Sequence, residues 1–311
     1  MKKICFIATG FFWSFFSTVW AKQPNVILIM TDDQGYGDLA CHGNPVIKTP
    51  NLDKLHAKSV RLTDFHVSPF CTPTRASLMT GRYPARTGAY RTSSGRSNLH
   101  HDEITMAQYF AKAGYRTGMM GKWHLGDNAP CRPQDMGFQD VVWHKGGGIG
   151  QAPDYYGNDY FDDTYERHRE GITKFEKFKG YCTDVFFEES IRFIEENKEN
   201  PFLLYISTNA PHSPYRVDKK WVTPYRNKVK WKFGAEFYGM ITNFDHNLGL
   251  LRQKLDELNL SNHSILVFLT DNGSAKGGRE KPNADEFHGF SAGMRGQKST
   301  IFEGGHRVPF F

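Results

Sequence analysis

The segment Cys71-Thr72-Pro73-Thr74-Arg75 combines a potential nucleophile with a fixed positive charge at helical spacing. Pro73 suits the first turn of a helix, where its missing N–H leaves no hydrogen bond unmade. Arg75 follows Cys71 by four residues, so a helix would place both side chains on one face. Free N–H groups at the helix start and the guanidinium would favour an anion beside the cysteine. The segment therefore indicates a nucleophile for an anionic substrate, although a buried structural cysteine before a helix fits equally well.

Two acidic clusters each follow a continuous apolar run. Asp32-Asp33 comes after residues 25–30, and Asp271-Asn272 comes after residues 264–269. Apolar runs of this kind are typical of strands in a parallel sheet, and such sheets place their sites at the carboxyl ends of strands. Hard oxygen ligands suit Ca²⁺ or Mg²⁺. Either pair alone could be a solvated turn, but two clusters together favour a metal site.

Three further residues lie where strands should end. Lys122 and His124 alternate along an extended segment bounded by glycines, and His212 follows the apolar run 201–206 on a proline-rich loop. A lysine beside a histidine suits anion binding combined with proton transfer. The alternative is that Lys122 and His124 are surface residues around a core Trp123. His100 and His101 could also meet a substrate, but ordinary loop positions explain them.

The elements that would position these residues alternate in type. Strands at 25–30, 116–120, 201–206 and 264–269 alternate with helices at 105–113, 183–196 and 237–258, which predicts an α/β sandwich with a mostly parallel sheet. A short strand is expected at 60–65. Residues 126–180 show little periodicity, and their aromatic and acidic stretch 155–165 suggests an exposed wall. The glycine triplet 146–148 reads as a flexible loop.

Composition and the N-terminus limit the class of protein and its cellular compartment. The 311 residues are 14% aromatic, so disorder is excluded, and the dispersed basic residues, with a net charge of +6, form no nucleic-acid-binding module. Residues 1–21 have a basic start, an apolar centre and small residues at a cleavage position, which predicts a secretory signal peptide and no stable membrane insertion afterwards. An uncleaved anchor is the alternative. Cys41, Cys71, Cys131 and Cys182 could form disulfides in such a compartment, but the pairing stays open.

Taken together, these motifs resemble the formylglycine-dependent sulfatases of the alkaline-phosphatase superfamily, in the family's order over residues 24–311. Cys71-Thr72-Pro73-Thr74-Arg75, followed by Gly81-Arg82, matches the signature whose cysteine is oxidised to formylglycine. Gly121-Lys122-Trp123-His124 matches a second signature. The resemblance implies an alkaline-phosphatase-like sandwich that hydrolyses sulfate esters.

The resemblance also implies roles for single residues. Cys71, Asp32, Asp33, Asp271 and Asn272 would hold the cation, usually Ca²⁺ with Mg²⁺ as an alternative. Cys71, Arg75, Lys122, His124, His212 and Lys298 would be the catalytic residues. A hydrated aldehyde at position 71 would attack sulfur, His212 with Lys298 would assist the leaving alkoxide, and His124 would help to expel sulfate. A formylglycine-generating maturation enzyme is the implied partner, and sulfated carbohydrates or aryl sulfates are the implied substrates of a secreted or periplasmic enzyme.

Residues 22–311 would form the catalytic domain, and family members run well past the equivalent of Phe311. The small C-terminal subdomain of the family is therefore expected to be absent, with an exposed apolar edge as the consequence. Two other functions remain open. One is hydrolysis of phosphonates or phosphodiesters within the same superfamily, and the other is binding of sulfated glycans without catalysis.

Overall fold

The computed structural model describes residues 23–92, 98–152, 156–275 and 287–311, so the expected signal peptide, residues 1–21, lies outside the described residues. One seven-stranded sheet runs through it in the order β5-β4-β3-β2-β6-β1-β7. The strands are β1 (Asn25–Thr31), β2 (Arg116–Lys122), β3 (Asp140–His144), β4 (Thr164–Arg169), β5 (Ile172–Lys177), β6 (Phe202–Ser207) and β7 (Ser264–Thr270). The pairs from β3 through β2, β6 and β1 to β7 are parallel, whereas β4 and β5 join antiparallel.

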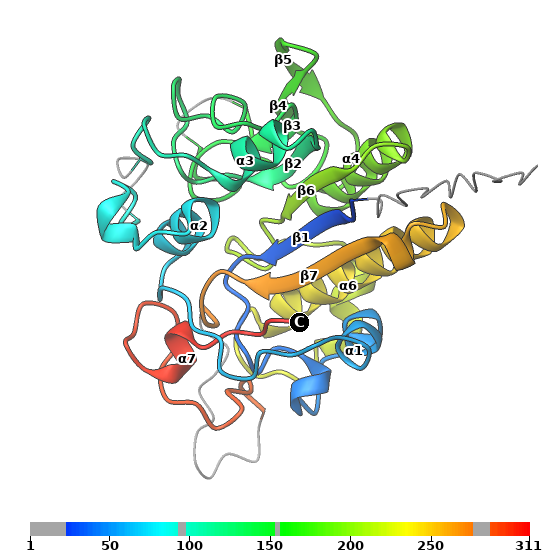
Figure 1. Cartoon of the computed structure of the whole chain (residues 1–311). Coiled ribbons are helices and arrows are strands. Elements are labelled where there is room, and N and C mark those ends of the chain that lie inside the picture. The colour runs from blue at the N-terminus through cyan, green and yellow to red at the C-terminus, as the bar shows by residue number, and fades with distance from the viewer. Residues whose placement is uncertain (1–22, 93–97, 153–155, 276–286) are drawn as a thin grey trace, which may run out of the picture.

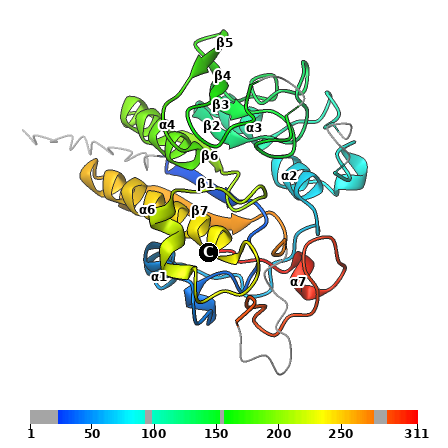
Figure 2. The same ribbon diagram turned by 180° about the vertical axis from the view of Figure 1, so that it is seen from behind.

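Seven α-helices occur in the described residues, and they lie on both faces of the sheet (Figures 1 and 2). They are α1 (Pro50–His56), α2 (Cys71–Thr80), α3 (Met106–Lys112), α4 (Cys182–Asn197), α5 (Lys219–Val222), α6 (Gly234–Glu257) and α7 (Glu303–His306). Helices α4 and α6 cover one face, and α2 and α3 cover the other. The predicted α/β architecture with a mostly parallel, helix-flanked sheet is confirmed.

Strand β1 shows why the central strands are apolar throughout. Ile27 and Ile29 pack against α4 and α6, while Leu28 and Met30 pack against α2 and α3. Successive side chains of a strand point to opposite faces, so a strand covered on both faces is apolar at every position. The same rule places the polar residues that follow β1 at the edge where the sheet ends.

Between residues 126 and 180, where the sequence shows little periodicity, the structure contains regular elements. Strands β3, β4 and β5 lie there and extend the sheet beyond β2. Of the expected exposed aromatic wall, residue 155 lies outside the described residues, and Tyr156 and Phe161 are exposed, at 41% and 38%. The expectation was wrong for Tyr160 and Tyr165, which are each only 2% exposed and belong to the core. Their rings pack near Tyr181 and Phe186, respectively.

The short strand expected at residues 60–65 does not form, and Val60 is 85% exposed. Only His66 makes an isolated antiparallel bridge there, with Arg307. The last residues do add to the sheet edge: Phe311 N–H donates to the Phe268 carbonyl, and Phe268 N–H donates to the Phe311 carbonyl. Ile265 of edge strand β7 remains half exposed.

The four cysteines in the described residues, Cys41, Cys71, Cys131 and Cys182, are free thiols. Among the described residues, none of the helices is both long and apolar enough to span a membrane.

Candidate active site

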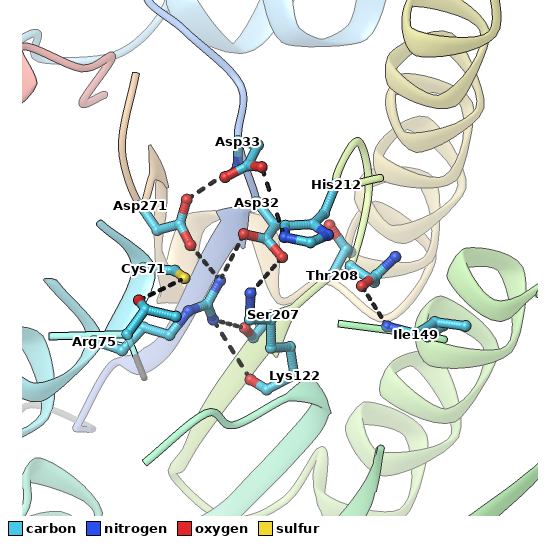
Figure 3. A network of polar contacts seen from close by, with 12 residues as sticks. Asp32, Asp33, Cys71, Arg75, Lys122, Ile149, Ser207, Thr208, His212 and Asp271 are labelled. Atoms are coloured by element: carbon cyan, nitrogen blue, oxygen red, sulfur yellow. Dashed lines mark hydrogen bonds and ion pairs between the residues drawn. The ribbon is translucent and has the colours of Figure 1, made fainter. Parts of the chain in front are cut away.

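The candidate catalytic and metal-binding residues lie at the carboxyl ends of the four adjacent strands β2, β6, β1 and β7 (Figure 3). Asp32 and Asp33 follow β1, and Asp271 follows β7. Lys122 ends β2, while His212 lies on the loop after β6. Parallel strands bring residues distant in the sequence to one edge in this way.

Cys71 is the first residue of helix α2 and is 2% exposed. The preceding Phe70 has extended backbone and makes no side-chain cap, so the helix start keeps free N–H groups. Burial acts to raise the pKa of the Cys71 thiol, but Lys122 and Lys298 lower it below its ordinary value. The sulfur therefore lies in a positive environment that favours a negatively charged species.

Arg75 is fully buried one turn after Cys71 and holds the helix to the sheet. Its Nη2 donates to Asp271 Oδ2 at 2.7 Å, and its Nη1 donates to Tyr205 Oη at 3.2 Å and to Ser207 Oγ. Although burial acts to lower the pKa of Arg75, Tyr205 and Asp271 raise it. The guanidinium stays charged and fixes the start of α2 against the strand ends.

Each buried carboxylate also meets a lysine or arginine. Lys122 Nζ lies 2.6 Å from Asp32 Oδ2, and Lys298 Nζ donates to Asp33 Oδ1. Burial raises the pKa of Asp32 well above its ordinary value, with Lys122 acting against that rise. Burial also acts to raise the pKa of Asp33, but His212 and Lys298 hold that pKa below its ordinary value.

The donor set fits a hard divalent cation. The ligand atoms of Asp32, Cys71 and Asp271 lie within 4.8 Å of one another, and those of Asp32, Asp33 and His212 form a second such group. Two buried oxygens, Asp32 Oδ1 and Asn272 Oδ1, have no hydrogen-bond partner among the described residues. Buried oxygens without a hydrogen bond are free to coordinate an ion, and carboxylate and amide oxygens suit Ca²⁺ or Mg²⁺.

Both predicted histidines face this cluster. His212 Nε2 lies 3.7 Å from Asp33 Oδ2, and its Nδ1 contacts the Ser213 carbonyl at 2.6 Å. His124 does not continue an extended segment as expected, because its φ is +58°. Burial, followed by Lys122 and Arg75, lowers the pKa of His124 well below its ordinary value, so the imidazole is neutral. The Nδ1 atom of His124 is buried without a hydrogen-bond partner in the described residues.

Several contributors to the site were missed by sequence reasoning. Tyr205 and Ser207 look like ordinary strand residues, yet both accept hydrogen bonds from Arg75. The glycine triplet was taken for a flexible loop, but a Cβ on Gly147 would lie 3.0 Å from the His124 ring. A Cβ on Gly148 would lie 2.9 Å from His212 Nδ1. The only signal in the sequence was three consecutive glycines. Glycines permit another group to approach the backbone closely, but they do not identify that group. His100 and His101 are given no role by the structure.

Comparisons with known proteins show which family model and which relatives this chain matches. The family model described as Sulfatase matches residues 24–311. Arylsulfatase J of Mus musculus is 30% identical over 304 residues, covering 94% of this chain and 48% of that protein. N-acetylgalactosamine-6-sulfatase of Homo sapiens is 30% identical over 308 residues, covering 93% of this chain and 56% of that protein.

The crystal structure of Ps i-CgsB in complex with k-i-k-neocarrahexaose is also similar to this chain. It shares 30% identity at a TM-score of 0.78, and the match covers 93% of this chain and 65% of that one. The chain spans about half the length of the curated relatives it matches.

Proposed function

The chain belongs to the sulfatase family, and we propose that it hydrolyses sulfate esters at the site around Cys71. One observation carries the proposal. Cys71 lies at a helix start, within reach of the carboxylates of Asp32 and Asp271, and Lys122 and Lys298 lower its pKa. A reactive group in a positive, buried environment suits attack on an anionic ester.

Two groups would complete the site. A divalent cation, Ca²⁺ or Mg²⁺, would be held by Asp32, Asp33, Asp271, Asn272 and residue 71, and would polarise a sulfate oxygen. Formylglycine at position 71, made by a maturation enzyme from Cys71, would supply a hydrated aldehyde as nucleophile. The buried oxygens Asp32 Oδ1 and Asn272 Oδ1, which accept no hydrogen bond among the described residues, support the first assignment. The burial of Cys71 at the start of α2 supports the second.

The positive side chains would bind and orient the ester. Lys122 and Lys298 place ammonium groups against Asp32 and Asp33, close enough to Cys71 to lower the pKa of its thiol. Preorganised charges of this kind stabilise negative charge that develops on sulfate oxygens. Arg75 acts differently, because both of its terminal nitrogens already bond within the fold, Nη2 to Asp271 and Nη1 to Tyr205 and Ser207. We assign Arg75 to holding residue 71 in place.

The two histidines would move protons. The Ser213 carbonyl can only accept, so His212 Nδ1 carries a proton and Nε2 faces the cluster. In the protonated ring, Nε2 can deliver a proton to the departing alkoxide; Asp33 favours that form, while burial opposes it. His124 is neutral and can accept a proton at residue 71 when sulfate leaves.

For the substrate class we propose sulfated carbohydrates, with aryl sulfates as accessible model substrates. Relatives at 30% identity carry names or titles that refer to sugars, namely N-acetylgalactosamine-6-sulfatase and the complex with k-i-k-neocarrahexaose. We propose a secreted or periplasmic location, based on the signal-like residues 1–21.

The test combines a mass measurement with a rate measurement. The full chain is coexpressed with a formylglycine-generating enzyme, and the mass of the peptide containing Cys71 is determined. Turnover of 4-nitrophenyl sulfate is then compared with turnover of the matching phosphodiester, with Cys71→Ala as the control. We expect the mass of an aldehyde and faster turnover of the sulfate that Cys71→Ala abolishes.

A thiol that persists at position 71 would exclude the formylglycine chemistry. Faster turnover of the phosphodiester would assign the site to phosphate esters instead. An aldehyde at position 71 with bound Ca²⁺ and sulfated glycan, but without turnover of either ester, would indicate a binding protein.

A further inference from the structure

A second cluster of metal-binding side chains shares no residue with the active site. His66, on the segment before α2, meets Glu303 and His306 of the short helix α7. One ligand atom from each residue lies within 4.8 Å of the other two. The cluster is partly exposed, since the His66 side chain is 39% accessible, so an ion can enter from solvent.

The outer nitrogens of both rings contact acceptors. His66 Nε2 lies 3.0 Å from Asp64 Oδ1, and His306 Nε2 lies 3.2 Å from the Ile301 carbonyl oxygen. An ionised carboxylate and a carbonyl can only accept, so each Nε2 must carry a proton. In both neutral rings, Nδ1 therefore presents a lone pair.

These two lone pairs point at each other. Nδ1 of His66 lies 2.8 Å from Nδ1 of His306. Two lone pairs at that distance repel unless a positive species lies between them, either a proton or a metal ion. Histidines that bind metals characteristically donate their other N–H to a carboxylate or a backbone carbonyl, and this pair has one of each.

The backbone holds the two histidines in register. His66 and Arg307 form an antiparallel bridge, Val67 N–H donates to the His306 carbonyl at 2.8 Å, and Val308 N–H donates to the Phe65 carbonyl at 3.1 Å. A preformed backbone of this kind lowers the entropy lost when a ligand binds.

We propose that His66, His306 and Glu303 bind a Zn²⁺-like transition-metal ion, separate from the cation at the active site. Imidazole nitrogen with a carboxylate is a donor set that suits Zn²⁺. Tetrahedral Zn²⁺ with bonds of about 2.0–2.1 Å needs its nitrogens about 3.3 Å apart, so the rings separate by about half an ångström on binding. A solvent molecule completes the coordination on the exposed side.

The charges around the cluster affect how well each of its side chains can bind the ion. Arg307 Nη1 lies 3.1 Å from Glu303 Oε2 and competes for that oxygen. Its Nε and Nη2, however, donate to the Thr63 carbonyl, which holds the guanidinium in place. The two imidazoles are thus the principal ligands, and Glu303 adds a third.

The proposed ion would clamp two segments that frame the active site. His66 belongs to the segment that leads into Cys71. Helix α7 supports the loop after β7, because Gly273 N–H donates to the Gly305 carbonyl at 2.9 Å. Binding to the folded state alone raises the melting temperature. The site is therefore structural, and its effect is measurable without any assay of activity.

A competing cluster, Cys41 with His42 and His56, supplies the matched control. Burial and Asp53 raise the pKa of the Cys41 thiol to about 12, so the thiolate that Zn²⁺ requires is disfavoured. Arg61 Nη1 also lies 3.3 Å from His56 Nε2 and places a positive charge beside that cluster.

The experiment uses the full chain saturated with Ca²⁺ and titrated with Zn²⁺ alone. Bound zinc is measured by equilibrium dialysis and elemental analysis, for the parent and for His66→Ala, His306→Ala, Asp64→Ala and Cys41→Ser. We expect one Zn²⁺ per chain and a rise in melting temperature of about 2 °C or more at saturation. Affinity should fall at least about tenfold in the first three variants and stay unchanged in Cys41→Ser.

Zinc-edge X-ray absorption of the parent protein tests the proposal without any variant. We expect nitrogen and oxygen ligands with the scattering of two imidazoles. Sulfur in the first coordination shell would overturn the proposal and direct attention to Cys41 or Cys71. Zinc binding that is unaffected by His66→Ala and His306→Ala, or the absence of stoichiometric binding, would also overturn it and leave a shared proton between the rings.

Discussion

Arg75 and Asp271 form a buried ion pair, with Nη2 and Oδ2 2.7 Å apart, across 196 residues of sequence. The pair joins helix α2, which begins at Cys71, to the end of strand β7. Neither side chain is more than 1% exposed. Losing one partner of such a pair is costly because the other charge remains buried, so the contact fixes where residue 71 lies relative to the acidic cluster.

Arg75→Lys should therefore damage the site while keeping its charge. A lysine ammonium cannot reproduce the planar fork that serves Asp271, Tyr205 and Ser207 together. We expect the free energy of unfolding to fall by about 1–3 kcal/mol, because buried acceptors lose donors. We expect kcat/KM for an aryl sulfate to fall at least about 100-fold. Urea unfolding and steady-state kinetics measure the two effects.

Arg82→Lys is the matched control. Arg82 pairs with Glu103 in the same region of the chain, but its side chain is about half exposed. A lysine at this position keeps a positive charge beside the buried Glu103 and can reach it from the partly exposed side, so both measurements should stay closer to the parent values than those of Arg75→Lys. Equal losses in the two variants would contradict the positioning role of Arg75.

The location of the site was predictable from the sequence because of where its polar residues stand. Asp32 and Asp271 each come one threonine after an apolar run that is typical of a buried strand. Carboxyl ends of parallel strands meet at one edge, so the convergence of these residues follows from fold class alone. Strands β1, β2, β6 and β7 were expected for the same reason, and the structure contains all four.

The strands and contacts that could not be predicted from the sequence are not marked by an apolar run followed by polar residues. Strands β4 and β5, Thr164–Arg169 and Ile172–Lys177, are rich in charged residues and lie at the sheet edge. Their stability comes from antiparallel pairing and from ion pairs such as Arg167 with Glu189, which a local pattern does not reveal. The contacts of Gly147 and Gly148 depend on tertiary packing in the same way.

Removing the active-site cation should abolish turnover without unfolding the chain. Each carboxylate of the acidic cluster already has a positive partner: Lys122 for Asp32, Lys298 for Asp33, and Arg75 for Asp271. These pairs offset part of the repulsion among the three carboxylates. After EGTA treatment we expect at least about a 100-fold loss of activity, an unchanged far-ultraviolet circular dichroism spectrum, and recovery when Ca²⁺ is added back.

Asn272→Ala checks this expectation, since it removes a proposed cation ligand and leaves all three ion pairs intact. The variant should need more Ca²⁺ for half-maximal activity. Unfolding of the parent chain in EGTA at room temperature would show instead that the cation, and not the ion pairs, holds the acidic cluster together.

Asp38 should make the stability of the fold depend on pH. Burial raises its pKa to about 7, against about 3.9 in an unfolded chain. The folded state therefore binds the proton more tightly, and the free energy of unfolding falls as pH rises from about 4 to about 7. Asp38→Asn retains an acceptor for the Gly35 N–H, which lies 2.8 Å from Oδ2. We expect it to reduce the loss of stability between pH 5 and pH 8 by about 2 kcal/mol.

Urea unfolding of Asp38→Asn and its parent at the two pH values measures this difference. Asp102→Asn, which changes an exposed carboxylate, should leave the difference at its parent value. If the free energy of unfolding changes equally between pH 5 and pH 8 in the parent and in Asp38→Asn, the assignment is contradicted.

His212→Ala should lower the rate of hydrolysis most for esters with poor leaving groups. If His212 delivers a proton to the departing oxygen, a phenol of low pKa leaves unaided, whereas a sugar hydroxyl needs the proton. Proton transfer by a positioned side chain contributes about 10²–10⁴-fold. We expect losses of that size for a sulfated sugar and smaller losses for 4-nitrophenyl sulfate. Equal losses for both substrates would assign His212 to binding alone.

Gly148→Ala should act through the same histidine. Its new Cβ would lie 2.9 Å from His212 Nδ1, and the loop cannot easily yield because the Ile149 N–H donates to Asn209 Oδ1 at 2.9 Å. A displacement of His212 should lower kcat for a sulfated sugar at least about tenfold and for 4-nitrophenyl sulfate less. In a double-mutant cycle, Gly148→Ala should add little to His212→Ala, because the group it displaces is already gone. Additive losses would show that Gly148 acts on the site by another route.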